Sequence, residues 1–82
     1  MDILPVHSEI LEYLKIHGLE KKFYKQLGFL KLNMRHPGLN VELLEPKHLK
    51  FYSFRIDRKY RAIFIFRRAG LIEILDANDH YK

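Results

Sequence analysis

The chain is short and basic, and hydrophobic residues supply about half of it. Its 82 residues are 48% hydrophobic and 13% aromatic, and fifteen Lys and Arg against ten Asp and Glu give a net charge of +5 at pH 7. We expect one domain over residues 1–82, because a chain of this length has room for a single small core. Cysteine is absent from the sequence, which excludes a disulfide framework and a thiolate zinc site.

The sequence also bears on compartment and partner. It contains no run of roughly 18 apolar residues, the length that a membrane-spanning helix needs, and its N-terminus lacks the layout of a signal peptide. We therefore expect a soluble, cytoplasmic protein. The positive charge favours a polyanion such as nucleic acid, because neutralising phosphates releases their condensed counterions. A solvated basic surface is the alternative, so the placement of the charges has to decide between them.

The first half of the sequence predicts a short strand and a helical hairpin. Residues 2–6 are predicted as an edge strand, since a proline within them cannot donate to a sheet ladder. A helix is predicted over about residues 8–16, with Ser8 as its N-cap, and Gly18 ends it. A second helix is predicted over residues 19–34. Its core-facing side carries apolar residues at steps of three or four: Leu19, Phe23, Leu27, Leu30 and Met34.

The second half of the sequence changes from helical spacing to strands. The segment over residues 35–38 contains Pro37 and Gly38, which break the helix and permit a turn. Short turns then separate four predicted strands, and such turns join antiparallel neighbours. The strands are predicted over residues 40–45, 51–57, 60–67 and 71–78. The predicted order is β-α-α-β-β-β-β, an α+β fold with a helical hairpin packed on a mostly antiparallel, twisted sheet.

Alternation in the two middle strands of this series predicts one aromatic face and one basic face. With a three-residue turn we expect Phe54 to pair with Phe64 and Arg55 to share a face with Arg61. A two-residue turn would mix the two faces, and we prefer the register that separates them. The basic face is expected to be exposed and to extend to Arg67. The side chains expected against the helices are Tyr52, Phe54, Phe64 and Phe66.

Three segments carry short motifs in a fixed order along the chain. They are residues 35–39 (RHPGL), residues 52–64 (YSFRIDRKYRAIF) and residues 72–81 (IEILDANDHY). In this order they resemble the RelE/ParE toxin superfamily, and most closely its YoeB-like and HigB-like branches. The resemblance covers nearly the whole chain and includes the C-terminal His-Tyr pair of YoeB-like toxins. It implies the toxin of a type II toxin–antitoxin system that cleaves messenger RNA on the ribosome, without a metal or cofactor.

The resemblance also implies which residues would carry the chemistry. Such cleavage needs a base for the 2′-hydroxyl, cations for the phosphorane and an acid for the leaving 5′-oxygen. By position, Arg61 matches the catalytic arginine, and Glu42 matches the acidic residue that acts as the YoeB-like base. Glu45, three residues later, stays open as the base instead. His80 matches the general acid, and Tyr81 would orient the substrate or stack on a base.

Further cations would bind the RNA. Arg55 matches the arginine of the family's arginine-Ile-Asn/Asp motif. The chain departs from YoeB-like sequences at their Lys-Gly turn, where residues 45–47 are Glu-Pro-Lys. Lys47 or Lys50 would supply the cation there, and Arg67 is a further RNA-binding candidate. We expect no metal site near the C-terminus, because a strand turns alternate side chains to opposite faces.

The resemblance implies partners, and it leaves other functions open. A cognate antitoxin is expected to cover the basic face with an acidic, partly disordered segment. Messenger RNA and the ribosome are the other expected partners, a membrane is not, and both a homodimer and a toxin–antitoxin hetero-oligomer stay open. One alternative is a ParE-like inhibitor of DNA gyrase that cleaves nothing. Another is an inactive module of the same fold that only binds RNA or a protein. The acid–base pair implied at Glu42 and His80 favours RNA cleavage.

Overall fold

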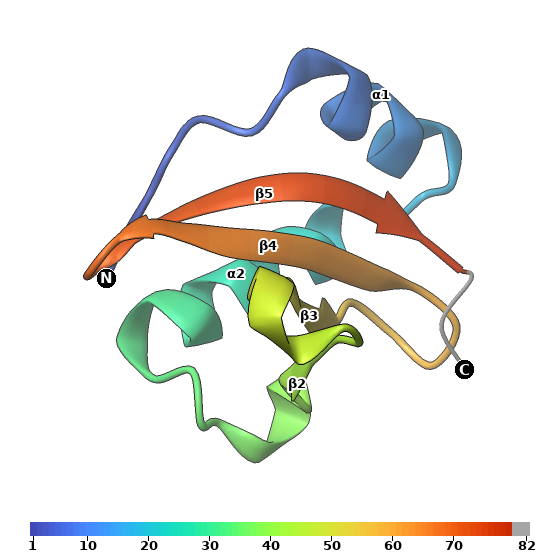
Figure 1. Ribbon diagram of the computed structural model, residues 1–82. Coiled ribbons are helices and arrows are strands. Elements are labelled where there is room, and N and C mark those ends of the chain that lie inside the picture. The colour runs from blue at the N-terminus through green and yellow to red at the C-terminus, as the bar shows by residue number, and fades with distance from the viewer. Residues whose placement is uncertain (80–82) are drawn as a thin grey trace.

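The computed structural model describes residues 1–79 and has the predicted α+β order, drawn in Figure 1. His80 and Tyr81 lie outside the described residues. The helices are α1 (Ser8–Ile16) and α2 (Glu20–Leu32), with two 3₁₀ turns, η1 (Pro37–Leu39) and η2 (Lys47–Leu49). The strands are β1 (Asp2–Ile3), β2 (Glu42–Leu43), β3 (Tyr52–Arg55), β4 (Arg61–Arg68) and β5 (Leu71–Asn78). Within residues 1–79 neither helix has the length and apolar character needed to cross a membrane.

The strands form one mixed sheet in the order β1-β5-β4-β3-β2. β1 runs parallel to β5, and the other neighbouring pairs are antiparallel. β1 is the predicted edge strand, but it ends at Ile3 and not at Val6, because Pro5 cannot donate to a ladder. In Figure 1, α2 lies behind the sheet and α1 runs beside β5. The two longest strands, β4 and β5, therefore form the middle of the molecule.

The helices pack on the sheet through the apolar positions that the spacing predicted. The buried residues of α1 are Ile10 and Leu14, and those of α2 are Phe23, Leu27 and Leu30. The N-cap predicted at Ser8 is wrong. His7 is the N-cap, because its carbonyl accepts the backbone N–H groups of Ile10 and Leu11, and no side chain caps the helix.

The aromatic face of the sheet forms the centre of the core, as predicted. Phe54 and Phe64 are fully buried, with ring centroids 6.0 Å apart, and Phe54 lies 6.0 Å from Phe23 of α2. Tyr52 and Phe66 are half-buried against the same cluster. Contact between these rings and α2 leaves the opposite face of β3 and β4 free of that helix.

The expected pairing of Phe54 with Phe64 is wrong by two residues. Phe54 lies opposite Ala62, and Phe64 lies opposite Tyr52. The turn sets this register, because the N–H of Ile56 donates to the carbonyl of Tyr60 at 2.9 Å. A shift of two residues keeps every side chain on its own face, so the predicted separation of aromatic from basic residues survives.

The strand predicted over residues 40–45 is much shorter than expected. Only Glu42 and Leu43 pair with β3. Asn40 has a left-handed backbone conformation (φ 48°) two residues before the strand begins, and η2 follows soon after the strand. The left-handed turn at Asn40 bends the chain across the end of β3 and directs its carbonyl to Arg61.

The turn between β3 and β4 yields a prediction about acid stability. Asp57 accepts hydrogen bonds from the backbone N–H groups of Lys59 and Tyr60, both at 2.8 Å, and pairs with Lys22 at 3.5 Å. Burial raises the pKa of Asp57, but these three donors together lower it below its ordinary value. A carboxyl with a lowered pKa stabilises the fold above about pH 4, and that contribution is lost as the pH falls through the folded-state pKa.

We therefore expect Asp57→Asn to lower the free energy of unfolding by about 0.5–1 kcal/mol at pH 7. The difference from the wild-type protein should shrink as the pH falls below about 4, where both side chains become neutral. Urea unfolding at a series of pH values measures both effects. Glu12→Gln removes one negative charge from the exposed side of α1 and is the control for net charge. A difference independent of pH would contradict the prediction.

Candidate functional site

The sheet face that points away from α2 carries two rows of mostly polar residues. Residues directly opposite one another on neighbouring strands share a face, so the strand register defines each row. The first row, from β2 to β5, is Glu42, Ser53, Ile63 and Asp76. The second row, from β3 to β5, is Arg55, Arg61 and Asn78. The predicted placement of Arg55 and Arg61 on one face is confirmed, and they lie directly opposite each other.

Arg61 is the centre of this face and is buried, which corrects the expectation that it is exposed. The residue is only 7% exposed. Its Nε donates to Ser53 Oγ at 3.0 Å, and its Nη2 donates to the carbonyls of Asn40 at 2.5 Å and Ser53 at 3.4 Å. The chain around Asn40 covers the guanidinium, and three oxygen acceptors replace the water that burial removes. Strand alternation predicts an exposed Arg61 because it takes no account of the loop around Asn40, which covers the guanidinium.

The charges around Arg61 act on one another. Burial lowers the pKa of the Arg61 guanidinium, the Glu42 carboxylate opposes that change, and Arg55 adds to it. An arginine remains charged at neutral pH despite such a shift. Glu42 and Arg55 are both exposed, so a carboxylate and a second cation flank the buried guanidinium. This combination can bind a phosphodiester and accept a proton beside it.

Two residues that hold the site were not identified from the sequence. Ser53 lies on the predicted basic face by alternation, but nothing in the pattern indicated that its hydroxyl accepts from Arg61. No pattern in the sequence indicated a role for Gln26 of α2. Its Nε2 donates to the carbonyls of Gly38 at 2.9 Å and Arg55 at 2.7 Å, and these acceptors are backbone atoms far away in the sequence. Gln26 thereby fastens α2 to the turn before Asn40 and to the end of β3.

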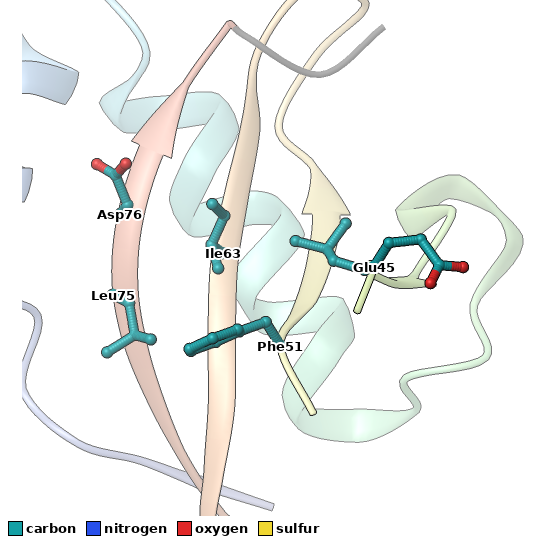
Figure 2. Close-up of a pocket in the computed structure, with 6 residues that line it drawn as sticks. Glu45, Phe51, Ile63, Leu75 and Asp76 are labelled. Atoms are coloured by element: carbon teal, nitrogen blue, oxygen red, sulfur yellow. The ribbon is translucent and has the colours of Figure 1, made fainter. Parts of the chain in front are cut away.

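The lysines predicted to bind RNA lie apart from Arg61. Lys47 and Lys50 are exposed on and after η2, at the end of β3 opposite to Arg55. The length of β3 separates these ends by roughly 10 Å. Glu45 is exposed, and Figure 2 shows its carboxylate pointing away from the sheet face. Glu42, in the same row as Ser53, is therefore the better placed of the two candidate bases.

Arg67 lies near the far end of β4, roughly 20 Å along the strand from Arg61. Its Nε donates to the carboxylate of Glu73, which also binds His7 Nε2 at 2.7 Å. The hydrogen bond from Arg67 and then that from His7 lower the pKa of Glu73. A role for Arg67 in RNA binding stays a prediction, and an ion pair already holds its side chain.

The end of β5 approaches the same site. β5 ends at Asn78, directly opposite Arg61, and Asn78 Nδ2 donates to Asp76 Oδ2 at 2.9 Å. The roles expected for His80 and Tyr81 fall outside the described residues, and they stay predictions. Residues 1–79 contain no cluster of three His, Asp or Glu side chains able to hold a metal ion.

An apolar hollow of about 290 Å³ lies beside this polar cluster. It is lined by Leu44, Glu45, Phe51, Ile63, Leu75 and Asp76. Figure 2 shows Phe51, Ile63 and Leu75 over one face of β4 and β5, with a helix on the opposite side of the sheet. Ile63 belongs to the row that contains Glu42 and Ser53, so the hollow and the polar cluster share a face.

Comparison with known proteins supports the fold. No protein-family model and no curated protein sequence matches the chain. A chain in the crystal structure of the heterotetrameric YoeB–YefM toxin–antitoxin complex from Staphylococcus aureus is similar in structure, with a TM-score of 0.61 and 22% sequence identity. The match covers 98% of this chain and 94% of that one. The fold is YoeB-like. This confirms the RelE-like fold predicted from the sequence motifs, and at this identity the likeness extends to the fold alone.

The support of Arg61 by Ser53 can be tested through stability. Ser53→Ala leaves the buried Arg61 Nε without its hydroxyl acceptor, so we expect the free energy of unfolding to fall by about 1–3 kcal/mol. Ser8→Ala makes the same chemical change at an exposed residue with no capping hydrogen bond, and should stay within about 0.5 kcal/mol of wild type. Urea unfolding followed by circular dichroism measures both. Equal effects of the two substitutions would show that Arg61 does not depend on Ser53.

Proposed function

We propose that the chain is the toxin of a toxin–antitoxin pair and a metal-independent endoribonuclease that cleaves messenger RNA on the ribosome. The observation that carries the proposal is the buried, hydrogen-bonded Arg61 flanked by Glu42 and Arg55 on an open sheet face. The YoeB-like fold supports it, because the similar solved chain belongs to a toxin–antitoxin complex. In this proposal the protein acts in the cytoplasm.

Arg61 would stabilise the transition state. Hydrogen bonds from Nε and Nη2 fix the guanidinium, while Nη1 makes no hydrogen bond to any of residues 1–79. Nη1 is therefore available to donate to a phosphate oxygen. A donor that is already fixed loses no orientational freedom as negative charge develops on the phosphorane. Arg55, exposed in the same row, would bind the neighbouring phosphate oxygen.

Glu42 would act as the general base. Its carboxylate lies in the row next to Arg61 and is exposed to a substrate. It would take the proton of the 2′-hydroxyl while that oxygen bonds to phosphorus and the bond to the 5′-oxygen breaks. The products are a 2′,3′-cyclic phosphate and a free 5′-hydroxyl, whose proton comes from the general acid. The sequence resemblance assigns that acid to His80 and substrate orientation to Tyr81.

The same face would bind the antitoxin. The similar solved structure is itself a toxin–antitoxin heterotetramer, which supports a cognate antitoxin as partner. An acidic antitoxin segment over Arg55 would block the access of RNA to Glu42. Lys47, Lys50 and Arg67, which lie away from Arg61, would contact more distant phosphates. A gyrase inhibitor that cleaves nothing would have no need of a carboxylate beside a buried arginine.

Cleavage of a defined messenger RNA on programmed ribosomes, with EDTA present, tests the proposal. We expect Glu42→Gln and His80→Ala to slow cleavage by about 10²–10⁴-fold through loss of the base and the acid. Arg61→Met should lose about 10²–10³-fold through loss of a transition-state donor.

The controls for this experiment remove a charge of the same sign at exposed positions away from the site. Arg68→Ala removes an exposed arginine at the far end of β4, and Glu12→Gln removes an exposed carboxylate from α1. Both should cleave like wild type, and circular dichroism checks the folding of every variant. Intact RNA together with inhibition of DNA gyrase would overturn the proposal. Cleavage that Glu42→Gln and Arg61→Met leave unchanged would show that the site lies elsewhere.

A further inference from the structure

We propose that the apolar hollow beside Arg61 receives one base of the bound RNA and favours a base that carries an amino group. The inference rests on the proposed function, since it assigns a role to the surface next to the same site. It would make the residues that line the hollow determinants of sequence preference. Of the reacting groups, Arg61 lies in the neighbouring row, and Glu42 lies in the row of Ile63 but two strands away, on β2.

The lining of the hollow suits a planar heterocycle. Phe51 presents an aromatic ring, and Leu44, Ile63 and Leu75 supply apolar surface around it. Bases that leave the nucleic-acid stack bind on aromatic side chains and apolar walls of this kind. The volume, about 290 Å³, lies at the lower limit of pockets for drug-sized ligands, so it fits a single ring system.

The position of the hollow relates it to the phosphate site. Ile63 follows Arg61 by two residues on β4, about 7 Å along the strand and on the same face. A nucleotide joins its base to its phosphate through one ribose, so the two ends of the unit are separated by a similar length. A nucleotide whose phosphate contacts Arg61 can therefore place its base over Ile63.

Two carboxylates line the hollow, and the one on β5 determines which base is favoured, because the Glu45 carboxylate points away from the sheet face. Asp76 is exposed there, and its Oδ1 and Oδ2 each accept one hydrogen bond, from Ala77 N at 2.8 Å and Asn78 Nδ2 at 2.9 Å. Each carboxylate oxygen keeps a further lone pair, so the group remains an acceptor. Adenine, cytosine and guanine offer it an amino group. Uracil offers one N–H between two carbonyl oxygens, and a carboxylate repels both of those.

The charges around the hollow favour RNA over an antitoxin segment as its occupant. Asp76 and Glu42 make this part of the face negative, whereas Arg55 and Arg61 make the adjoining part positive. An acidic protein segment is attracted to the arginines and repelled from the hollow. A nucleotide is compatible with both parts, because its anionic phosphate suits the arginines and its neutral base can donate to the carboxylate.

Methyl NMR of the protein tests the proposal without requiring turnover. Four uncleavable 2′-deoxy dinucleotides, each with A, C, G or U as the base under test, are titrated into protein with labelled Ile and Leu methyl groups. We expect the Ile63 and Leu75 methyls to shift with A, C and G and least with U. The methyls of Leu32, a residue of α2 that is 87% exposed, serve as the control and should not move.

Two variants test the aromatic ring and the carboxylate separately. The dispersion of the methyl spectrum checks that both variants fold. Phe51→Leu keeps an apolar side chain but removes the aromatic face, and should weaken binding about tenfold. Asp76→Asn turns an acceptor into a mixed donor and acceptor, and should abolish the disadvantage of U. Leu32→Ala is the matched control and should change neither affinity nor base order.

The outcomes separate this inference from the proposed function. RNA cleavage with unmoved Ile63 and Leu75 methyls would overturn the inference and leave the function intact. Methyl shifts in a protein that never cleaves RNA would support the hollow and overturn the function. An unchanged base order in Asp76→Asn would overturn the assigned preference. Methyl shifts caused by an acidic peptide and by none of the dinucleotides would make the occupant a protein segment, which also overturns the inference.

Discussion

The burial of the Arg61 guanidinium is the constraint on which the rest of the site depends. A charged group removed from water is costly unless hydrogen bonds and opposite charges replace the lost solvation. Ser53 supplies two of its acceptors from the adjacent strand, and Asn40 supplies the third from a loop. The left-handed conformation of Asn40 directs that carbonyl inward, so the loop must fold over the sheet before β2 begins.

Support for this loop comes from the helical layer. Gln26 binds the carbonyls of Gly38 and Arg55 with one amide nitrogen, and thus connects α2 to the turn before Asn40 and to the end of β3. The neighbouring Lys22 reaches Asp57 in the turn that sets the register of β3 against β4. The core rings on one face and the polar rows on the other are consequently fixed by the same few connections. A shift of α2 would move the acceptors of Arg61 as well as the apolar contacts.

The limits of sequence reasoning follow from the range of each interaction. The helical hairpin and the faces of β3 and β4 could be predicted, because periodicity is local and a register shift of two residues leaves each face unchanged. The pairing of Phe54 with Ala62 depends on Asp57 hydrogen bonds within the turn, which alternation does not encode. The burial of Arg61 depends on the backbone carbonyl of Asn40, which is 21 residues away in the sequence. No pattern of side chains predicts such an acceptor.

Arg55 and Arg61 lie in one row but differ in the role that each can have at a phosphate site. Arg61 is buried and fixed on β4, the middle strand of the sheet, whereas Arg55 is exposed near the end of β3. A fixed donor discriminates between geometries, and an exposed one adapts to them at the cost of side-chain entropy. In the proposed reaction the geometry that changes is that of the phosphorus, so its stabilisation belongs to Arg61. β4 also positions Ile63 in the hollow, and this places the phosphate and the base of one nucleotide on the same rigid strand.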